Sequence, residues 1–181
     1  MNIAPAATNA EQHVLDHLGA KFGVKSDAVQ VVSLTPRDLP AGAAEFYVEA
    51  KGSHGHENYN YVVIDDKVYC SRVEGEFSRL LREQSLLERK DVSAAQYMRL
   101  YSLFALPRQV KYIDANVLSR NAQDYRAFPQ VQAPAVAGRP DGGLTLTFFA
   151  SPARTVQPSK WTVSISPTYE VAVNSEDVGK R

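Results

Sequence analysis

The sequence predicts an α+β protein in which a mostly antiparallel, twisted β-sheet packs against about three α-helices. Short segments with alternating apolar and polar residues recur along the 181-residue chain, as expected of half-buried strands. Other segments place apolar residues at intervals of three and four, the spacing of amphipathic helices. The clearest strands, near the C-terminus, each have one apolar face, which an antiparallel sheet packed on helices requires.

Length and composition favour one domain over residues 1–181. Hydrophobic residues make up 44% and charged residues 22% of the chain, as in ordinary globular proteins. We expect a core of helix, meander and helices at 9–118. A long irregular segment rich in Pro and Ala follows at 119–143, and antiparallel strands complete the domain at 144–174.

The first element is a helix that begins near Thr8 or Asn9, either of which can cap it, and ends at Gly23. Its apolar stripe consists of Val14, Leu15, Leu18 and Phe22. His13 and His17 lie four residues apart on the opposite face. Two imidazoles at that spacing can share a metal ion, but no third ligand is indicated, so we interpret them as solvated histidines.

A strand is expected at 28–34, and a proline-broken loop follows it. The central feature is a meander between Ala44 and Arg72: a strand at 44–51, a loop at 52–58, a strand at 59–64 and a strand from Lys67. Asp65-Asp66 fits the tight turn between the last two strands, because Asp tolerates the turn dihedrals.

The loop of the meander carries His54, His56 and Glu57, which have the chemistry to bind a metal or to move a proton. An ordinary flexible loop is the favoured interpretation. Tyr59 and Tyr61 follow in one row of the next strand, where a tyrosine suits a half-buried surface or a contact site. These five residues and Trp161 are the six candidate binding residues.

Two helices are predicted next, at 76–88 and at 94–106. Ser93 is expected to cap the second of them by accepting from Gln96. That helix should be largely buried, with Leu103 in the core. A strand is expected at 109–118.

The irregular segment 119–143 is long for a loop inside a compact domain. Tyr125, Phe128 and Val131 could pin it to a groove. Strands then follow at 144–149, 161–166 and 169–173, and the polar tail from Asn174 is expected to be frayed.

The charge balance argues against a general nucleic-acid binder. The chain has 20 basic and 20 acidic side chains, so its net charge is zero, whereas nucleic-acid binding needs excess positive charge. Residues 1–71 hold 5 basic and 9 acidic side chains, a net of −4, and residues 72–166 hold 13 and 8, a net of +5. No secretory signal and no apolar run of about 18 residues are present, so we expect a cytoplasmic protein without a membrane partner.

Motifs that would indicate a known chemistry are absent from the sequence. It contains no Gly-rich phosphate loop, no GxGxxG and no GxSxG. Cys70 is the only cysteine, which excludes an intrachain disulfide and a cysteine pair for zinc. No catalytic residue, metal site or cofactor is therefore predicted.

These observations favour a non-catalytic protein that binds another protein or assembles with itself, as an adaptor, chaperone or inhibitor does. The element order over about residues 9–88 is similar to that of cystatin-like folds and of the chaperones of bacterial secretion systems. The alternative is a small-molecule-binding protein or a small enzyme. Its pocket would lie between the sheet and the helix 94–106, with His54, His56 or Tyr side chains as polar handles.

Overall fold

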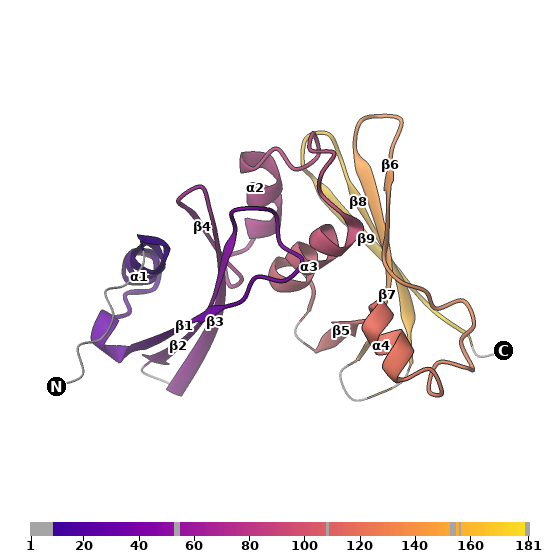
Figure 1. Cartoon of the computed structure of the whole chain (residues 1–181), viewed down its shortest axis with the longest axis horizontal. Helices are drawn as coiled ribbons and strands as arrows, with labels where there is room; N and C mark the ends of the chain where they lie inside the picture. The colour runs from indigo at the N-terminus through magenta and orange to yellow at the C-terminus, as the bar shows by residue number, and fades with distance from the viewer. Residues whose placement is uncertain (1–8, 53–54, 108, 153–154, 156, 180–181) are drawn as a thin grey trace. The chain divides into compact units, whose positions relative to one another are not determined.

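The computed structural model describes residues 9–52, 55–107, 109–152, 155 and 157–179. These residues contain four α-helices and nine strands, and the strands form two antiparallel sheets (Figure 1). The predicted α+β class is confirmed, but the strands form two sheets where one was expected. The chain divides into two compact units, Met1–Glu76 and Phe77–Arg181, and each is described by itself. The prediction of one domain stays a prediction.

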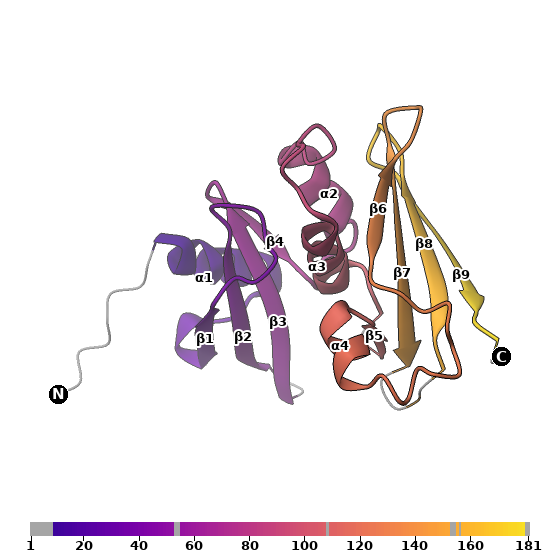
Figure 2. The same ribbon diagram turned by 45° about the vertical axis from the view of Figure 1, so that its right-hand side comes forward.

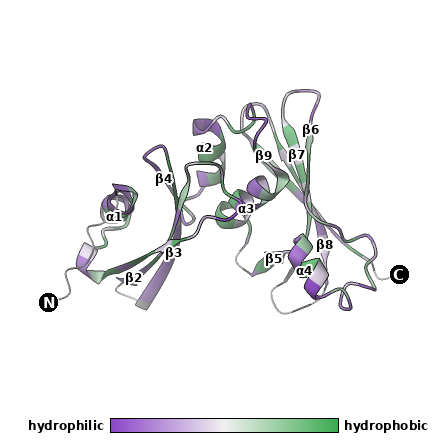
Figure 3. Cartoon of the chain, viewed as in Figure 1, coloured by the Kyte–Doolittle hydropathy of each residue, from purple (hydrophilic) through white to green (hydrophobic). Residues whose placement is uncertain are grey.

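Unit 1 contains a four-stranded meander in which each strand pairs with the next. The strands are β1 (Val29–Leu34), β2 (Ala44–Gly52), β3 (Gly55–Ile64) and β4 (Lys67–Cys70), and their order in the sheet is β1-β2-β3-β4. All three pairings are antiparallel. Figure 3 shows that β3 changes from hydrophilic to hydrophobic along its length, so its second half is suited to the core.

Helix α1 (Asn9–Phe22) covers one face of this sheet. Its buried residues Val14 and Leu18 pack on one face of the sheet, which includes the predicted row of Tyr59 and Tyr61. The buried residues of this face are Phe46, Val48, Ala50, Tyr59, Tyr61, Val63 and Cys70. The helix ends as predicted, because Gly23 adopts φ +66 and its N–H donates to the Gly19 carbonyl at 3.1 Å. A residue without Cβ takes this left-handed conformation at little cost.

The turn between β3 and β4 is also as predicted. Asp65 and Asp66 have φ of 48° and 61°, the signature of a two-residue hairpin turn whose twist matches the flanking strands. The register that follows from it pairs Tyr61 with Cys70 and Ile64 with Lys67.

Unit 2 contains the second sheet. Its strands are β5 (Val110–Tyr112), β6 (Ala135–Gly138), β7 (Leu144–Pro152), β8 (Ser159–Ile165) and β9 (Val171–Asp177). The order is β5-β7-β8-β9, and β6 also pairs with β7. β5 and β6 lie in succession along one edge of β7, and β8 occupies the other. The tail expected to fray at Asn174 instead continues β9 to Asp177.

The strand predicted at 109–118 is wrong beyond Tyr112. Asp114 accepts a hydrogen bond from the Val117 N–H at 2.7 Å and begins helix α4 (Ala115–Arg120), because a carboxylate at this position satisfies a free N–H of the first turn. The segment 119–143 is likewise more ordered than expected, since it includes β6. Phe128 is buried with Ile113, Phe149 and Val178, and Tyr125 and Val131 pack against this cluster.

Helix α2 (Glu76–Glu83) is shorter than the predicted 76–88. Ser85 adopts φ 46, its N–H donates to Arg82 O, and the Leu86 N–H donates to Leu81 O. These two bonds form the motif that closes a helix C-terminus. Leu81 and Leu86 are both fully buried, so the closing turn is held by apolar burial even though serine replaces the usual glycine.

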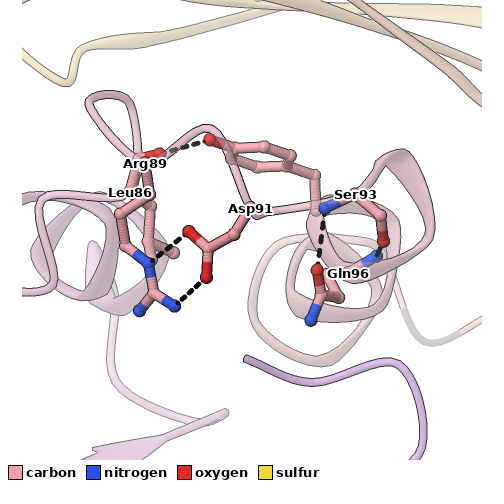
Figure 4. A network of polar contacts seen from close by, with 6 residues as sticks. Leu86, Arg89, Asp91, Ser93 and Gln96 are labelled. Carbon is pink, nitrogen blue, oxygen red and sulfur yellow. Dashed lines mark hydrogen bonds and ion pairs between the residues drawn. The ribbon is translucent and has the colours of Figure 1, made fainter. Parts of the chain in front are cut away.

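The connection from α2 to α3 (Ala94–Phe104) is held by the polar contacts of Figure 4. Arg89 pairs with Asp91 through two bonds of 3.1 and 2.7 Å, and the Tyr97 hydroxyl donates to the Leu86 carbonyl. Ser93 and Gln96 form the reciprocal capping box that begins α3, which confirms the predicted cap. Leu103, expected in the core, is only partly buried. The buried residues of α3 are Tyr97, Met98, Leu100 and Tyr101.

Candidate functional site

The predicted loop 52–58 is largely part of the sheet. β3 begins at Gly55, and the pairing of β2 with β3 continues to His56 opposite Lys51 and Glu57 opposite Ala50. The expectation of a loop at His56 and Glu57 is therefore wrong, because backbone pairing extends the hairpin beyond the last strongly apolar residues. His54 lies outside the described residues.

The side chains of His56 and Glu57 point to opposite faces of the sheet, since successive side chains in a strand alternate between the two faces. His56 lines a hollow of about 240 Å³ with Asp27, Glu49 and Lys51. Glu57 lies on the α1 side with Tyr59. The structure thus separates two residues that the sequence placed in one loop.

Glu57, Tyr59 and Arg72 form a compact cluster. The Tyr59 hydroxyl donates to Glu57 Oε2, and Arg72 Nη1 lies 3.1 Å from the same oxygen. The Arg72 guanidinium carbon lies 4.6 Å from the centre of the Tyr59 ring, within the range of a cation–π contact. One carboxylate oxygen therefore receives both a phenol and a guanidinium.

This environment raises the pKa of Tyr59 to about 12. Burial of the phenol is the main cause, and the hydrogen bond to the Glu57 carboxylate adds to it, while the charge of Arg72 acts in the opposite direction. Tyr59 is consequently a neutral hydrogen-bond donor at physiological pH and not a base.

The cluster borders a groove of about 550 Å³ at the C-terminal end of α1. Its floor is apolar and aromatic, since the Phe22 and Tyr59 rings lie 4.9 Å apart beside Ala28 and Ala50. The remaining lining residues are Gly23, Val24, Lys25, Lys51 and Glu57. The groove combines a surface for apolar groups with charged side chains at its rim.

The charges at the groove are predominantly positive. Lys25 and Lys51 are exposed and form no ion pair with any residue that the structure describes. Glu57, in contrast, is paired with Arg72. The lining residues thus hold two lysines and one carboxylate, a charge of +1, and the adjacent Arg72 raises the local charge to +2.

The other two candidate residues lie elsewhere. Tyr61 is fully buried beneath α1, where its hydroxyl is 3.3 Å from His17 Nδ1. Trp161 lies in β8 of unit 2, stacked on Phe148 with ring centres 5.9 Å apart. Both contribute to packing in the structure, and a binding role for either stays a prediction.

The thiol of Cys70 is poorly suited to be a nucleophile. Cys70 is fully buried, and this burial is the main cause that raises its pKa above the ordinary value of 9.0, so the reactive thiolate is disfavoured. The register puts Cys70 opposite Tyr61, five residues along β3 from His56. At about 3.3 Å per residue this separation argues against a Cys–His pair.

Metal ligands do not gather in the described part of the chain, where no three His, Cys, Asp or Glu side chains are placed to hold an ion. The His13 Nε2 atom instead lies 3.5 Å from an Asp66 oxygen.

On the sheet of unit 2, α3 contacts β7 through Tyr101 and Phe148, whose ring centres are 5.6 Å apart. The pocket predicted beside this helix stays a prediction.

Sequence reasoning missed Arg72, Phe22, Lys25 and Lys51 as parts of the site. A signal for Arg72 was present, because the register of the predicted hairpin, continued two residues past Cys70, places Arg72 opposite Tyr59. The Ser71 N–H indeed donates to the Asn60 carbonyl at 2.9 Å. No comparable signal linked the end of α1 to the start of β3, since that contact depends on how the helix packs.

Comparison with protein families, curated proteins and solved structures found no match to this chain. None of the helices within the described ranges is both long and apolar enough to cross a membrane.

Proposed function

We propose that the protein is a non-catalytic binding protein whose groove at the end of α1 receives an acidic segment of a partner protein. The observation that carries this proposal is the pairing of an aromatic floor, Phe22 and Tyr59, with the unpaired rim lysines Lys25 and Lys51. Such a surface suits a chain that presents a carboxylate next to an apolar side chain.

The internal pairing of Glu57 supports an acidic partner. A free carboxylate at the rim would repel a negatively charged segment, but Arg72 neutralises this one at 3.1 Å. The positive potential of the two lysines is then available for a partner, and complementary rim charges mainly increase the association rate and the specificity.

The openness of the groove favours a peptide segment over a small molecule. Small ligands are usually buried over 70–90% of their surface, whereas this groove is only about half enclosed. Ala28 and Lys51 line both the groove and the neighbouring hollow at His56. The two depressions are therefore adjacent, and because Asp27 and Glu49 line the hollow, we expect the acidic part of an extended chain to lie in the groove and not in the hollow.

The test is a titration of fluorescent acidic and basic peptides that share one central Phe. We expect the acidic peptide to bind more tightly, with an affinity that falls as salt is added. Reversing one rim charge with Lys51→Glu or Lys25→Glu should weaken binding about tenfold, which corresponds to ~1.4 kcal/mol.

Lys90→Glu is the matched control, because it makes the same charge change at an exposed position of the α2–α3 connection. It should leave the affinity unchanged. The proposal fails if wild-type protein prefers neither peptide, or if Lys90→Glu weakens binding as much as Lys51→Glu does.

A further inference from the structure

Strand β9 is the outermost strand of the sheet in unit 2 and lies beside β8 alone (Figure 2). Six of its seven residues are exposed. Val173 is 48% exposed, more than any other large hydrophobic residue that the structure describes. An outer strand offers a row of backbone donors and acceptors to another strand.

The hydrogen bonds at both ends of β9 show which of its backbone groups face outward. The Glu170 carbonyl accepts from the Ser166 N–H at 2.9 Å, and the Val178 N–H donates to the Pro158 carbonyl at 3.1 Å. Even-numbered positions therefore bond toward β8, because antiparallel ladders alternate with a period of two. The backbone groups of Val171, Val173, Ser175 and Asp177 point to the free edge.

β9 lacks the usual features that protect an outer strand. Lys, Pro and bulges commonly block such edges, but β9 reads VAVNSED and its register with β8 is continuous. Its acidic residues are held by its own sheet: Glu176 pairs with Lys160 at 3.2 Å, and Asp177 accepts from Ser159 at 3.0 Å.

We infer that two copies of this chain pair through β9, antiparallel about a two-fold axis at Asn174. In this register Glu176 faces Ala172 of the second copy and Asp177 faces Val171, so no carboxylate opposes another. A parallel pairing would bring the acidic ends together, and like charges directly opposite are destabilising. The proposed occupant of the edge is a second copy in the reversed direction, in which each carboxylate faces an uncharged residue.

This register also matches the outward backbone groups. Val173 lies opposite Ser175 of the second copy, and Val171 lies opposite Asp177, which allows about eight main-chain hydrogen bonds between the copies. The two exposed Val173 side chains lie on one face, and each is partly covered by Ser175 of the second copy directly opposite it. The contact is isologous, so it closes as a dimer at this edge.

Sedimentation or light scattering on the full chain tests the pairing. We expect a particle of about 40 kDa, twice the 20.0 kDa chain. Ser175→Pro removes only an outward N–H and should give monomers, with a smaller fall in Tm than Asn174→Pro causes. Asn174→Pro, the matched control, removes an N–H bonded to β8 and should lower the Tm. Val173→Lys adds an edge lysine and should weaken the dimer at least tenfold even if the proline variant folds poorly.

Single cysteines test the register, because Cys70 is buried and gives no background. Facing Asn174 residues would occupy a non-hydrogen-bonded pair with Cα atoms about 4.5 Å apart, within disulfide reach. Asn174→Cys should form a disulfide-linked dimer under mild oxidation, whereas Ala172→Cys and Ser175→Cys should not. A monomeric wild-type chain at about 100 µM, roughly the weak end of specific self-association, or equal cross-linking at all three positions, would overturn the inference.

Discussion

A single arginine neutralises the carboxylate at the candidate groove. Arg72 is the only described cation paired with Glu57, and it also lies over the Tyr59 ring. Its position follows from the two-residue turn at Asp65-Asp66, since any slip of this register by one residue would send Arg72 to the opposite face of the sheet. The binding surface therefore depends on a turn outside it.

At this scale we predict the effect of Arg72→Met, which keeps most of the aliphatic part of the side chain and removes its charge. The free energy of unfolding in urea should fall by about 1 kcal/mol, the sum of a partly exposed ion pair and a cation–π contact. The pKa of Tyr59 should rise further, because the charge of Arg72 lowers it in the wild type.

The shift in the pKa of Tyr59 is measured from the absorbance of tyrosinate during a titration to alkaline pH. Tyr59→Phe is the reference that identifies the signal of Tyr59. Arg82→Met serves as the control, since Arg82 is exposed on α2 and its loss should change neither quantity. An unchanged titration in Arg72→Met would show that Arg72 does not act on Tyr59.

Among the elements, α3 shows how the periodicity of a helix and its actual burial can differ. Apolar residues follow α3 around most of its circumference, but only the face with Leu100 and Tyr101 is fully buried. Leu103 belongs to a partly exposed face. Composition indicates that a helix packs, and neighbouring elements decide which of its apolar residues form the core.

Leu100→Ala should therefore destabilise the protein by about 2–4 kcal/mol, the cost of a buried cavity. Leu103→Ala on the same helix should cost less than half of that, because its side chain keeps contact with water in the folded state. Urea unfolding of the two variants provides the comparison. Equal losses would indicate that both leucines contribute equally to the core.

Across the whole molecule, buried tyrosines link stability to alkaline pH. Tyr59 of unit 1 and Tyr97 and Tyr101 of unit 2 each have a pKa raised to about 12, chiefly by burial. Burial also raises the pKa of Tyr61 far above its ordinary value of 10.0. Both units therefore hold phenols that ionise more easily in the unfolded chain.

We predict that the free energy of unfolding falls between pH 10 and about 12. Below pH 10 these phenols are neutral in both states and their contribution is complete. Above pH 10 the unfolded state releases protons that the folded state retains, so folding is progressively disfavoured until the folded pKa is reached.

Urea midpoints measured in steps across this range check the prediction. Tyr101→Phe removes one titrating group whose pKa shift comes from burial alone, and it should make the decline shallower. The expectation is wrong if the midpoint stays constant up to pH 12, or if Tyr101→Phe leaves the slope unchanged.

Helix ends, caps and tight turns could be predicted from the sequence alone. The end of α1 at Gly23, the turn at Asp65-Asp66 and the capping box of Ser93 each depend on a few neighbouring residues, and all three are present. The alternation of β3 likewise predicted that Tyr59 and Tyr61 share one row, and the structure packs that row against α1. These features were predictable because dihedral preferences and caps act within one turn of the backbone.

Only the tertiary structure separated His56 from Glu57, brought Arg72 and the end of α1 to the groove and divided the strands between two sheets. The backbone N–H and C=O groups that pair strands are nearly the same whatever the side chain. The sequence therefore shows that a strand exists, but not where its pairing ends or which strand it pairs with. The packing of distant segments decides these points, and the candidate site is built from such contacts.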